Sequence, residues 1–203
     1  MLDHLIYIAP DLDHAVAALK ARLGVRPAAG GSHPGLGTRN ALLALGADTY
    51  LEVLAPDPAQ AGASAVFDFA SLTQPRLGTW AAKAIDIDAR VERAANAGYD
   101  AGLVVPMERR LPDNTVLEWR LTWRSQPEHD GLVPFLIDWG DSPSPATSAP
   151  TGCSLSSFYA EHPNPSSVQP VLSALEVDLD VRGGEHPALV AIIDGPKGRF
   201  ELR

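Results

Sequence analysis

Apolar and polar positions follow two different periods within residues 1–57 of the chain. A short apolar run at Leu5–Ile8 predicts a strand, and from Leu12 to Leu23 the apolar residues recur at helical spacing. Two further apolar runs, "ALLALG" and "TYLEVLAP", flank a Gly-Ala-Asp turn and predict a hairpin. The predicted order is therefore strand, helix and then two or three strands, which we describe as a βαβββ module.

The same order of elements returns over residues 77–141. The segment "LGTWAAKAIDIDARVERAANAGYD" holds a strand-like run followed by apolar residues at helical spacing. The segments "LVVPMERR", "VLEWRLTW" and "LVPFLIDWGD" then predict three strands. When the second segment is placed on the first without gaps, Leu77 falls on Leu2. Internal repetition of this kind predicts a fold built from repeated modules.

A fainter third copy of the pattern covers residues 151–203. It follows the segment "GDSPSPATSAP", whose Ser, Pro and Ala content is typical of a linker. We therefore predict one domain at 1–145, made of the modules 1–57 and 77–141. The segment 151–203 is predicted to be a third, divergent module that packs on this domain or completes it.

Composition limits the classes of function that the chain can have. The 203 residues are 45% hydrophobic, which is enough to build a sizeable core. The net charge of −9 argues against binding to nucleic acid or to an anionic membrane. No apolar run approaches the roughly 20 residues of a membrane span, and the start lacks a signal-peptide pattern. With a single cysteine, Cys153, neither an intrachain disulfide nor a thiolate cluster can form, so we expect a cytoplasmic protein.

Two ionisable residues stand where aliphatic residues would make better strands. Alternation along the first strand places His4 on one face with Ile6 and Ile8, and Glu52 lies within the apolar run of the closing strand. A carboxylate on a buried face is costly unless it is paired or bound to metal. Both side chains could meet on the concave side of a curved sheet and form half of a divalent-metal site. They could equally pair with each other, or lie at the surface.

The segments "LDHLIYIAPDLDHAVAAL" and "HPGLGTRNALLALGADTYLEVLAPDP" resemble the start of a glyoxalase-like protein of the vicinal oxygen chelate superfamily. The resemblance is close over 2–58 and extends to 77–141. It implies an α+β fold in which repeated βαβββ modules form a cupped mixed sheet with helices on the outside. It also implies a divalent metal ion, such as Zn, Ni, Mn or Fe, that chelates vicinal oxygens of a substrate. His4 matches the first-strand ligand of that superfamily, and Glu52 matches the last-strand ligand.

The later modules depart from the ligand pattern of this superfamily. On the gapless placement, Thr79 falls where His4 stands, and in the closing strand Leu136 falls where Glu52 stands. The third module offers Ser157 and Glu201, of which Glu201 is the better ligand. Either the metal is held by few protein ligands and water, or another residue completes the site, or the site is not metallic.

Three other segments carry candidate site residues. In "SHPGLGTRN", His33 and Asn40 flank a glycine-rich turn, which predicts two pocket residues or an ordinary turn before a strand. Arg120, in "LEWRLTWR", could clamp a substrate carboxylate or form an ion pair on an exposed sheet face. Trp80 could line the cup, although the tryptophans are mostly expected in the core. Arg109 is expected to be solvated.

These residues support several functions for the chain. The first is a small-molecule lyase, isomerase or dioxygenase, with His4 and Glu52 as metal ligands and His33 and Glu52 in catalytic roles. Its substrate would contact His33, Asn40, Arg120 and Trp80. The second is a protein that binds or sequesters a small molecule on the same fold without turnover. The third is a non-catalytic structural repeat protein that dimerises through its sheet edges. A homodimer is a possible state of the chain.

Overall fold

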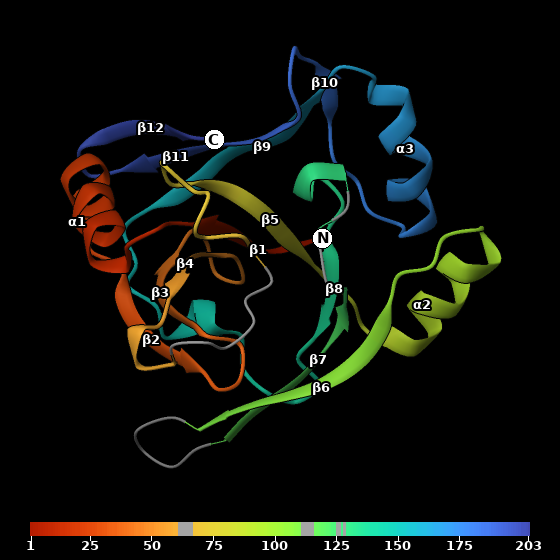
Figure 1. Ribbon diagram of the computed structural model, residues 1–203, viewed down its shortest axis with the longest axis horizontal. Coiled ribbons are helices and arrows are strands. Elements are labelled where there is room, and N and C mark those ends of the chain that lie inside the picture. Colours follow the sequence, from red (N-terminus) through yellow and green to blue (C-terminus); the bar gives the residue numbers. More distant parts are fainter. Residues whose placement is uncertain (61–66, 111–115, 125–126, 128) are drawn as a thin grey trace.

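The structure is a computed structural model that describes residues 1–60, 67–110, 116–124, 127 and 129–203. Its strands and helices follow the order βαβββ three times along the chain (Figure 1). The first group consists of β1 (Leu2–Ile8), α1 (Leu12–Leu23), β2 (Ala28–His33), β3 (Thr38–Ala44) and β4 (Tyr50–Pro56). The second consists of β5 (Arg76–Lys83), α2 (Ile87–Asn96), β6 (Leu103–Arg110), β7 (Val116–Trp123) and β8 (Phe135–Asp138). The third consists of β9 (Ser154–His162), α3 (Pro165–Ala174), β10 (Val181–Gly183), β11 (Ala188–Gly195) and β12 (Gly198–Leu202).

The first two groups form one curled sheet of eight strands in the order β2-β3-β4-β1-β5-β8-β7-β6. In each group the first strand pairs in parallel with the last strand, β1 with β4 and β5 with β8. The two groups meet where β1 and β5 run antiparallel. Figure 1 shows α1 on one flank of this sheet and α2 on the other, both outside its curve. The predicted α+β fold, with repeated modules in a cupped mixed sheet, is confirmed.

Local sequence explains the limits of α1. The side chain of Asp11 accepts a hydrogen bond from the backbone N–H of His14 at 2.7 Å, which satisfies a free donor of the first turn. At the other end Gly24 has a φ of 90°, and its N–H donates to the carbonyl of Lys20 at 3.0 Å. Between these ends Leu12, Val16 and Leu19 are buried. The helix therefore covers the outer face of the sheet with one apolar stripe.

The third group forms a separate sheet of four strands in the order β10-β9-β11-β12. Here β9 pairs in parallel with β10, whereas the first strand of the other groups pairs with the last. The ring of Trp80 meets the ring of Phe158 edge to face at 5.2 Å, and the N–H of Leu77 donates to the carbonyl of Arg203. Buried residues of all three groups belong to one hydrophobic cluster. The second sheet therefore packs on the outer face of the first, while the division into domains stays a prediction.

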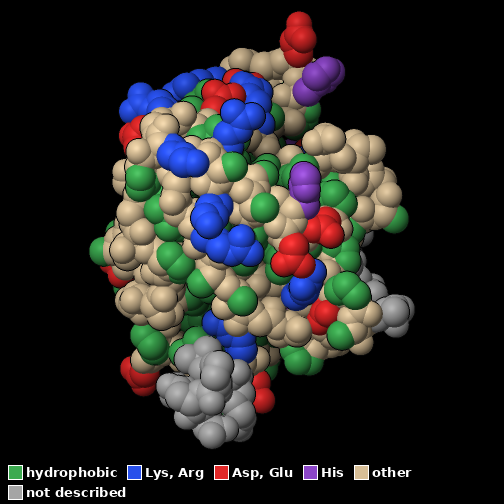
Figure 2. Space-filling view, turned by 90° about the vertical axis from the view of Figure 1, so that its left-hand side faces the viewer, with side chains coloured by type: hydrophobic (Ala, Val, Ile, Leu, Met, Phe, Trp, Pro, Cys, Tyr) green, Lys and Arg blue, Asp and Glu red, His purple; other side chains and the backbone are tan. Residues whose placement is uncertain are grey.

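The surface and the helices add two observations. No helix within the described ranges is long and apolar enough to cross a bilayer. Although the net charge is −9, several groups of Lys and Arg side chains lie on the face shown in Figure 2, which is on the α1 side of the molecule. The cytoplasmic location stays a prediction.

Candidate functional site

The concave side of the eight-stranded sheet holds a cavity of about 200 Å³ to which both halves of the sheet contribute. A small group of polar side chains meets at one end of it: His4, His33, Asn40 and Glu52 from the first half and Thr79 from the second. Most of the remaining wall is apolar or aromatic: Ile6, Leu36, Leu42, Leu54, Met107, Trp119, Leu121, Phe135, Ile137 and Trp139. A few converging polar groups in an apolar cavity are the usual composition of a small-molecule site.

A β-bulge sets the orientation of His4. Leu2 of β1 pairs with Ala82 and His4 pairs with Ala81, so Asp3 is an extra residue in β1. Such a bulge lets neighbouring side chains interact that would otherwise point to opposite faces. Accordingly, a carboxylate oxygen of Asp3 lies 2.7 Å from Nδ1 of His4. In the neutral imidazole, a proton on Nδ1 meets this carboxylate and leaves Nε2 with its lone pair.

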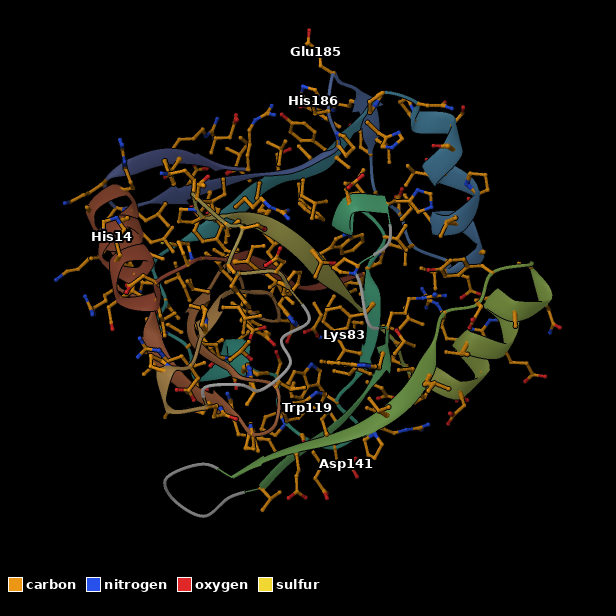
Figure 3. The ribbon with its side chains drawn as sticks, viewed as in Figure 1. His14, Lys83, Trp119, Asp141, Glu185 and His186 are labelled. Carbon is orange, nitrogen blue, oxygen red and sulfur yellow. The ribbon has the colours of Figure 1, made fainter. Side chains whose placement is uncertain are left out.

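The carboxylate of Asp3 is fully buried and has three partners. Besides His4, it accepts a hydrogen bond from Nε1 of Trp139 at 3.1 Å and lies 3.9 Å from Nζ of Lys83. Each partner comes from a different strand or loop, and Figure 3 shows Lys83 within the ring of strands. A buried charge is tolerated when it is paired and hydrogen-bonded in this way. Asp3 is therefore held rigidly behind His4.

Glu52 lies beside His4 and is the start of a second chain of contacts. One oxygen of Glu52 is 3.6 Å from Nε2 of His4, and the other accepts a hydrogen bond from Nδ2 of Asn40 at 2.6 Å. The same Asn40 nitrogen is 3.2 Å from Nε2 of His33, whose Nδ1 is 2.8 Å from the hydroxyl of Thr38. The register of β3 and β2 brings Asn40 opposite Gly31. This chain fixes the position of the Glu52 carboxylate.

A glycine makes room for the amide of Asn40. A Cβ atom at Gly30 would overlap Oδ1 of Asn40 and lie 3.0 Å from its Cγ. Oδ1 is itself buried and has no hydrogen-bond partner among the described residues. Any larger residue at position 30 would push the amide away from Glu52. The absence of a side chain at Gly30 is thus part of the site.

Aromatic rings enclose His4 on the other sides. The ring of Tyr50 stacks on the imidazole with centroids 4.5 Å apart, and Phe135 meets it edge on at 5.7 Å. Burial raises the pKa of the Tyr50 hydroxyl well above its usual value, and the nearby charges of Glu52 and Asp3 add to this. Tyr50 therefore remains protonated at every physiological pH. The rings hold the imidazole in place and keep water away from it.

Comparison with known proteins identifies the family. The glyoxalase-like domain family matches residues 2–176. This chain belongs to the glyoxalase-like domain family. No curated protein matches it.

Several solved structures resemble this glyoxalase-like protein. A hypothetical protein from Staphylococcus aureus aligns over 100% of this chain and 85% of its own, with 19% identity and a TM-score of 0.65. Methylmalonyl-CoA epimerase from Mycobacterium tuberculosis aligns over 68% of this chain and 87% of its own, with 25% identity and a TM-score of 0.44. A methylmalonyl-CoA epimerase in complex with methylmalonyl-CoA and NH4+ covers 71% and 97%, with 22% identity and a TM-score of 0.48. The likeness to the Staphylococcus aureus protein concerns the fold.

Four of the predicted site residues lie together in the cavity, namely His4, His33, Asn40 and Glu52. Their roles in catalysis and metal binding stay predictions. The residue of the second module that matches Glu52 differs from the predicted Leu136, as the gapless placement of β5 on β1 shows. Ile6 pairs with Glu52, and Ala81, which falls on Ile6 in that placement, pairs with Phe135. Phe135, which lines the cavity, thus takes the place of Glu52, while Leu136 is buried in the core.

Two predicted substrate contacts lie elsewhere. Arg120 is absent from the cavity wall, because its guanidinium pairs with Asp88 of α2 on the outer face of the sheet. Trp80 also faces outward, since it is only 1% exposed and its Nε1 donates to the carbonyl of Leu132 at 2.8 Å. Their positions do not support contact with a substrate. Glu201 likewise pairs with Arg203 on the second sheet.

Three cavity features escaped sequence reasoning. Asp3 gave no signal, because strand alternation places neighbouring side chains on opposite faces and a bulge cannot be read from one sequence. Arg109, which was expected in solvent, lines the cavity wall. Arg109 lies on the same face of the β6–β7 ribbon as Trp119. The alternation of side chains along β6 and β7 could therefore have indicated its position. Tyr50 shares the face of Glu52, so it too was within reach of the pattern.

The donor atoms do not fit the four-ligand metal centre that the superfamily implies. His4 and Glu52 are suitable ligands 3.6 Å apart, but the second module places Thr79 and Phe135 at the matching positions. In addition, the amide of Asn40 occupies the lone pairs of Glu52 and His33 that face each other. Within the described residues no group of three or more His, Cys, Asp or Glu side chains could hold a metal ion. The predicted divalent metal therefore carries no step of the function below.

Proposed function

We propose that this glyoxalase-like protein is a small-molecule enzyme that moves a proton on a carbonyl-bearing substrate, with His4 as the acid–base group. The observation that carries the proposal is the buried Asp3–His4 pair, with Nδ1 of His4 on the carboxylate and Nε2 toward the cavity. This arrangement holds an imidazole in one tautomer, as general base catalysis requires. A proton accepted at Nε2 would lie near the carboxylate of Glu52 at 3.6 Å.

The proposed step follows from these positions. Nε2 of His4 takes a proton from the carbon next to the substrate carbonyl, and the electron pair of that C–H bond forms the C=C bond of an enolate. The carbonyl electron pair moves onto its oxygen. Return of the proton, from His4 or from Glu52, to the same carbon restores the carbonyl. When that carbon carries a hydroxyl group, the intermediate is an enediolate; the hydroxyl proton passes to the other oxygen, the neighbouring carbon takes the returned proton, and the carbonyl forms on the first carbon. Asn40 and His33 position Glu52, and the outcome is an isomerisation or epimerisation.

A second function, ligand binding without turnover, is favoured by a specific observation. Thr79 and Phe135 stand where the superfamily pattern has metal ligands, and the second half of the cavity is lined by aromatic rings. Such a wall suits the retention of an apolar ligand. In that case the Asp3–His4 pair would serve only to bind a polar group of the ligand.

Proton exchange separates the two functions. The protein would be incubated in D2O with small ketones and 2-oxo acids, and loss of the proton next to the carbonyl would be followed by NMR. We expect exchange above the buffer rate for at least one compound, and a decrease of roughly 10²- to 10⁴-fold in His4→Gln. Treatment with a chelator should leave the rate unchanged. Compounds that bind but exchange no faster than in buffer would establish the binding function instead.

A further inference from the structure

Arg109 is a cation on an otherwise apolar face. In β6 and β7 the residues that face the cavity include Met107 and Arg109 on one strand and Trp119 and Leu121 on the other. Figure 3 shows Trp119 within the curve of the sheet. A guanidinium on such a face loses hydration without gaining attraction from its neighbours, so it is unfavourable unless it meets an anion.

The described residues provide no such anion for Arg109. Its Nε is buried without a hydrogen-bond partner, and it forms no ion pair or hydrogen bond with any residue that the structure describes. The neighbouring cations differ from it in this respect. Arg120 pairs with Asp88, and Arg124 lies 3.9 Å from Asp100 and 5.5 Å from the ring centre of Tyr99. Arg109 therefore has unused donors on the cavity wall.

The side chain of Arg109 reaches across the cavity mouth to the first half of the sheet. A Cβ atom built on Gly31 of β2 would lie 3.7 Å from its Cδ, so the stem spans the gap between the two edge strands. Arg109 also lines the same cavity as His4 and Glu52. The guanidinium thus acts on the same space as His4 and Glu52.

We propose that Arg109 binds the carboxylate of the substrate, which makes the substrate class a small carboxylic acid with a carbonyl group near His4. This deepens the proposed function and rests on it. The planar guanidinium can bind a carboxylate through two parallel N–H···O bonds, which fixes the orientation of the acid as well as its place. The apolar part of the acid then lies against Trp119 and Trp139, and the cavity of about 200 Å³ suits a compact molecule.

Calorimetric titration of matched ligand pairs tests this assignment. The probes are 2-oxobutanoate and 2-oxo-4-phenylbutanoate, each compared with its primary amide, which has the same shape without the charge. We expect the wild-type protein to bind at least one acid roughly tenfold to hundredfold more tightly than its amide. Arg109→Met should abolish this preference, and the matched control Arg120→Met, changed on the outer face, should keep it. Arg109→Lys, which keeps the charge but loses the two-pronged geometry, should show a reduced preference.

The lysine variant keeps the test decisive if the methionine variant does not fold. Equal binding of acid and amide by the wild type overturns the assignment, as does failure of both acids to bind at millimolar concentration. A preference that survives unchanged in a folded Arg109→Met or Arg109→Lys protein also overturns it. The titration requires no turnover, so it separates this inference from the proposed function. An acid preference without proton exchange would remove the enzymatic role and leave the carboxylate site in place.

Discussion

The buried carboxylate of Asp3 determines which nitrogen of the His4 ring carries the proton when the imidazole is neutral. Asp3→Asn preserves the shape of the side chain but replaces an acceptor by an amide that can also donate to Nδ1. The imidazole then loses its preferred tautomer, and we expect proton exchange to fall by about two orders of magnitude. The measurement is the NMR exchange rate, with thermal unfolding recorded alongside because Trp139 and Lys83 also lose a charged partner.

The control for this change is Trp139→Phe. It removes the 3.1 Å hydrogen bond from Nε1 to Asp3 but leaves the carboxylate against His4. We expect it to lower stability more than exchange. If Trp139→Phe and Asp3→Asn lowered exchange equally, the tautomer of His4 would not be the reason.

Gly30 and Asn40 form a pair whose sizes are matched. In Gly30→Ala the new methyl group overlaps the Asn40 amide, so the hydrogen bond to Glu52 must lengthen or break. We expect a loss of about 1–3 kcal/mol in the free energy of unfolding, measured by urea denaturation. Because Asn40→Ala removes the obstacle, the double variant should be less destabilised than the sum of the single variants.

Gly46→Ala serves as the control for this pair, since no atom lies within 4 Å of a Cβ built at Gly46. It should change the free energy of unfolding little. Strict additivity of Gly30→Ala and Asn40→Ala would contradict the steric explanation.

The repeated order of strands and helices along the chain was within reach of the sequence, whereas the pairing of the strands and the face of individual residues were not. Repetition of the βαβββ pattern predicted the first two modules, and the structure shows that they meet where β1 pairs with β5. Alternation in β7 separated Trp119 from Arg120, but nothing in the sequence tells which side of a sheet is concave. The apolar Trp119 face was therefore taken for core, and the outer Arg120 for a ligand contact.

The uncertainty about faces also explains why the wrong residue of the second module was matched to Glu52. The gapless placement holds only for the first strand and helix of each module, so the closing strands were matched separately, and the choice of Leu136 missed Phe135 by one residue. Because side chains in a strand alternate, one residue separates the core from the cavity. His4, His33, Asn40 and Glu52 could be proposed as a group because all lie in the module where the resemblance is closest.

Trp80 tests the packing between the two sheets. Trp80→Phe removes the 2.8 Å hydrogen bond to the carbonyl of Leu132 and reduces the contact with Phe158. We expect a loss of about 1–3 kcal/mol in the free energy of unfolding, because a buried carbonyl loses its partner and a small void remains. Since Trp80 faces away from the cavity, the ratio of acid to amide binding should not change. A changed ratio would mean that the two faces of β5 are coupled.

The β11–β12 hairpin contributes a pH-dependent term to stability. Hydrogen bonds from Arg199 and from the hydroxyl of Ser156 lower the pKa of Asp194 to about 2. Because the pKa is lower in the folded state, the carboxylate stabilises the fold above its unfolded pKa of about 3.8, and this contribution is lost as the pH falls toward 2. Asp194→Asn should therefore be less stable than wild type at pH 6 but equal to it near pH 2. The free energy of unfolding of both proteins would be measured by urea denaturation at the two pH values. A difference between them that persists at pH 2 would exclude this cause.

Across the whole molecule, three modules share one hydrophobic cluster but only two surround the cavity. The second sheet, formed by the third module, covers the outer face of β5 and leaves the mouth of the cup to the first two modules. The predicted homodimer is therefore not needed to bury the outer face of the sheet, and it stays a prediction. The chemistry of the cavity therefore depends on the side chains that the first two modules supply to it, and these differ between the two modules.

That inequality leads to an expectation about metal content. One module supplies His4 and Glu52, and the other supplies Thr79 and Phe135, so a divalent ion would find two side-chain ligands where tight binding needs three or four. Protein purified without chelator or affinity-tag metal should contain far less than one equivalent of divalent metal by elemental analysis. Its melting temperature should not change when EDTA is added, because no metal contributes to stability.

One equivalent of metal that is lost in both His4→Ala and Glu52→Ala would contradict this expectation. The cavity would then act as a chelate centre completed by water, and the acid–base role of His4 would have to be abandoned, because its Nε2 would be bound to the metal.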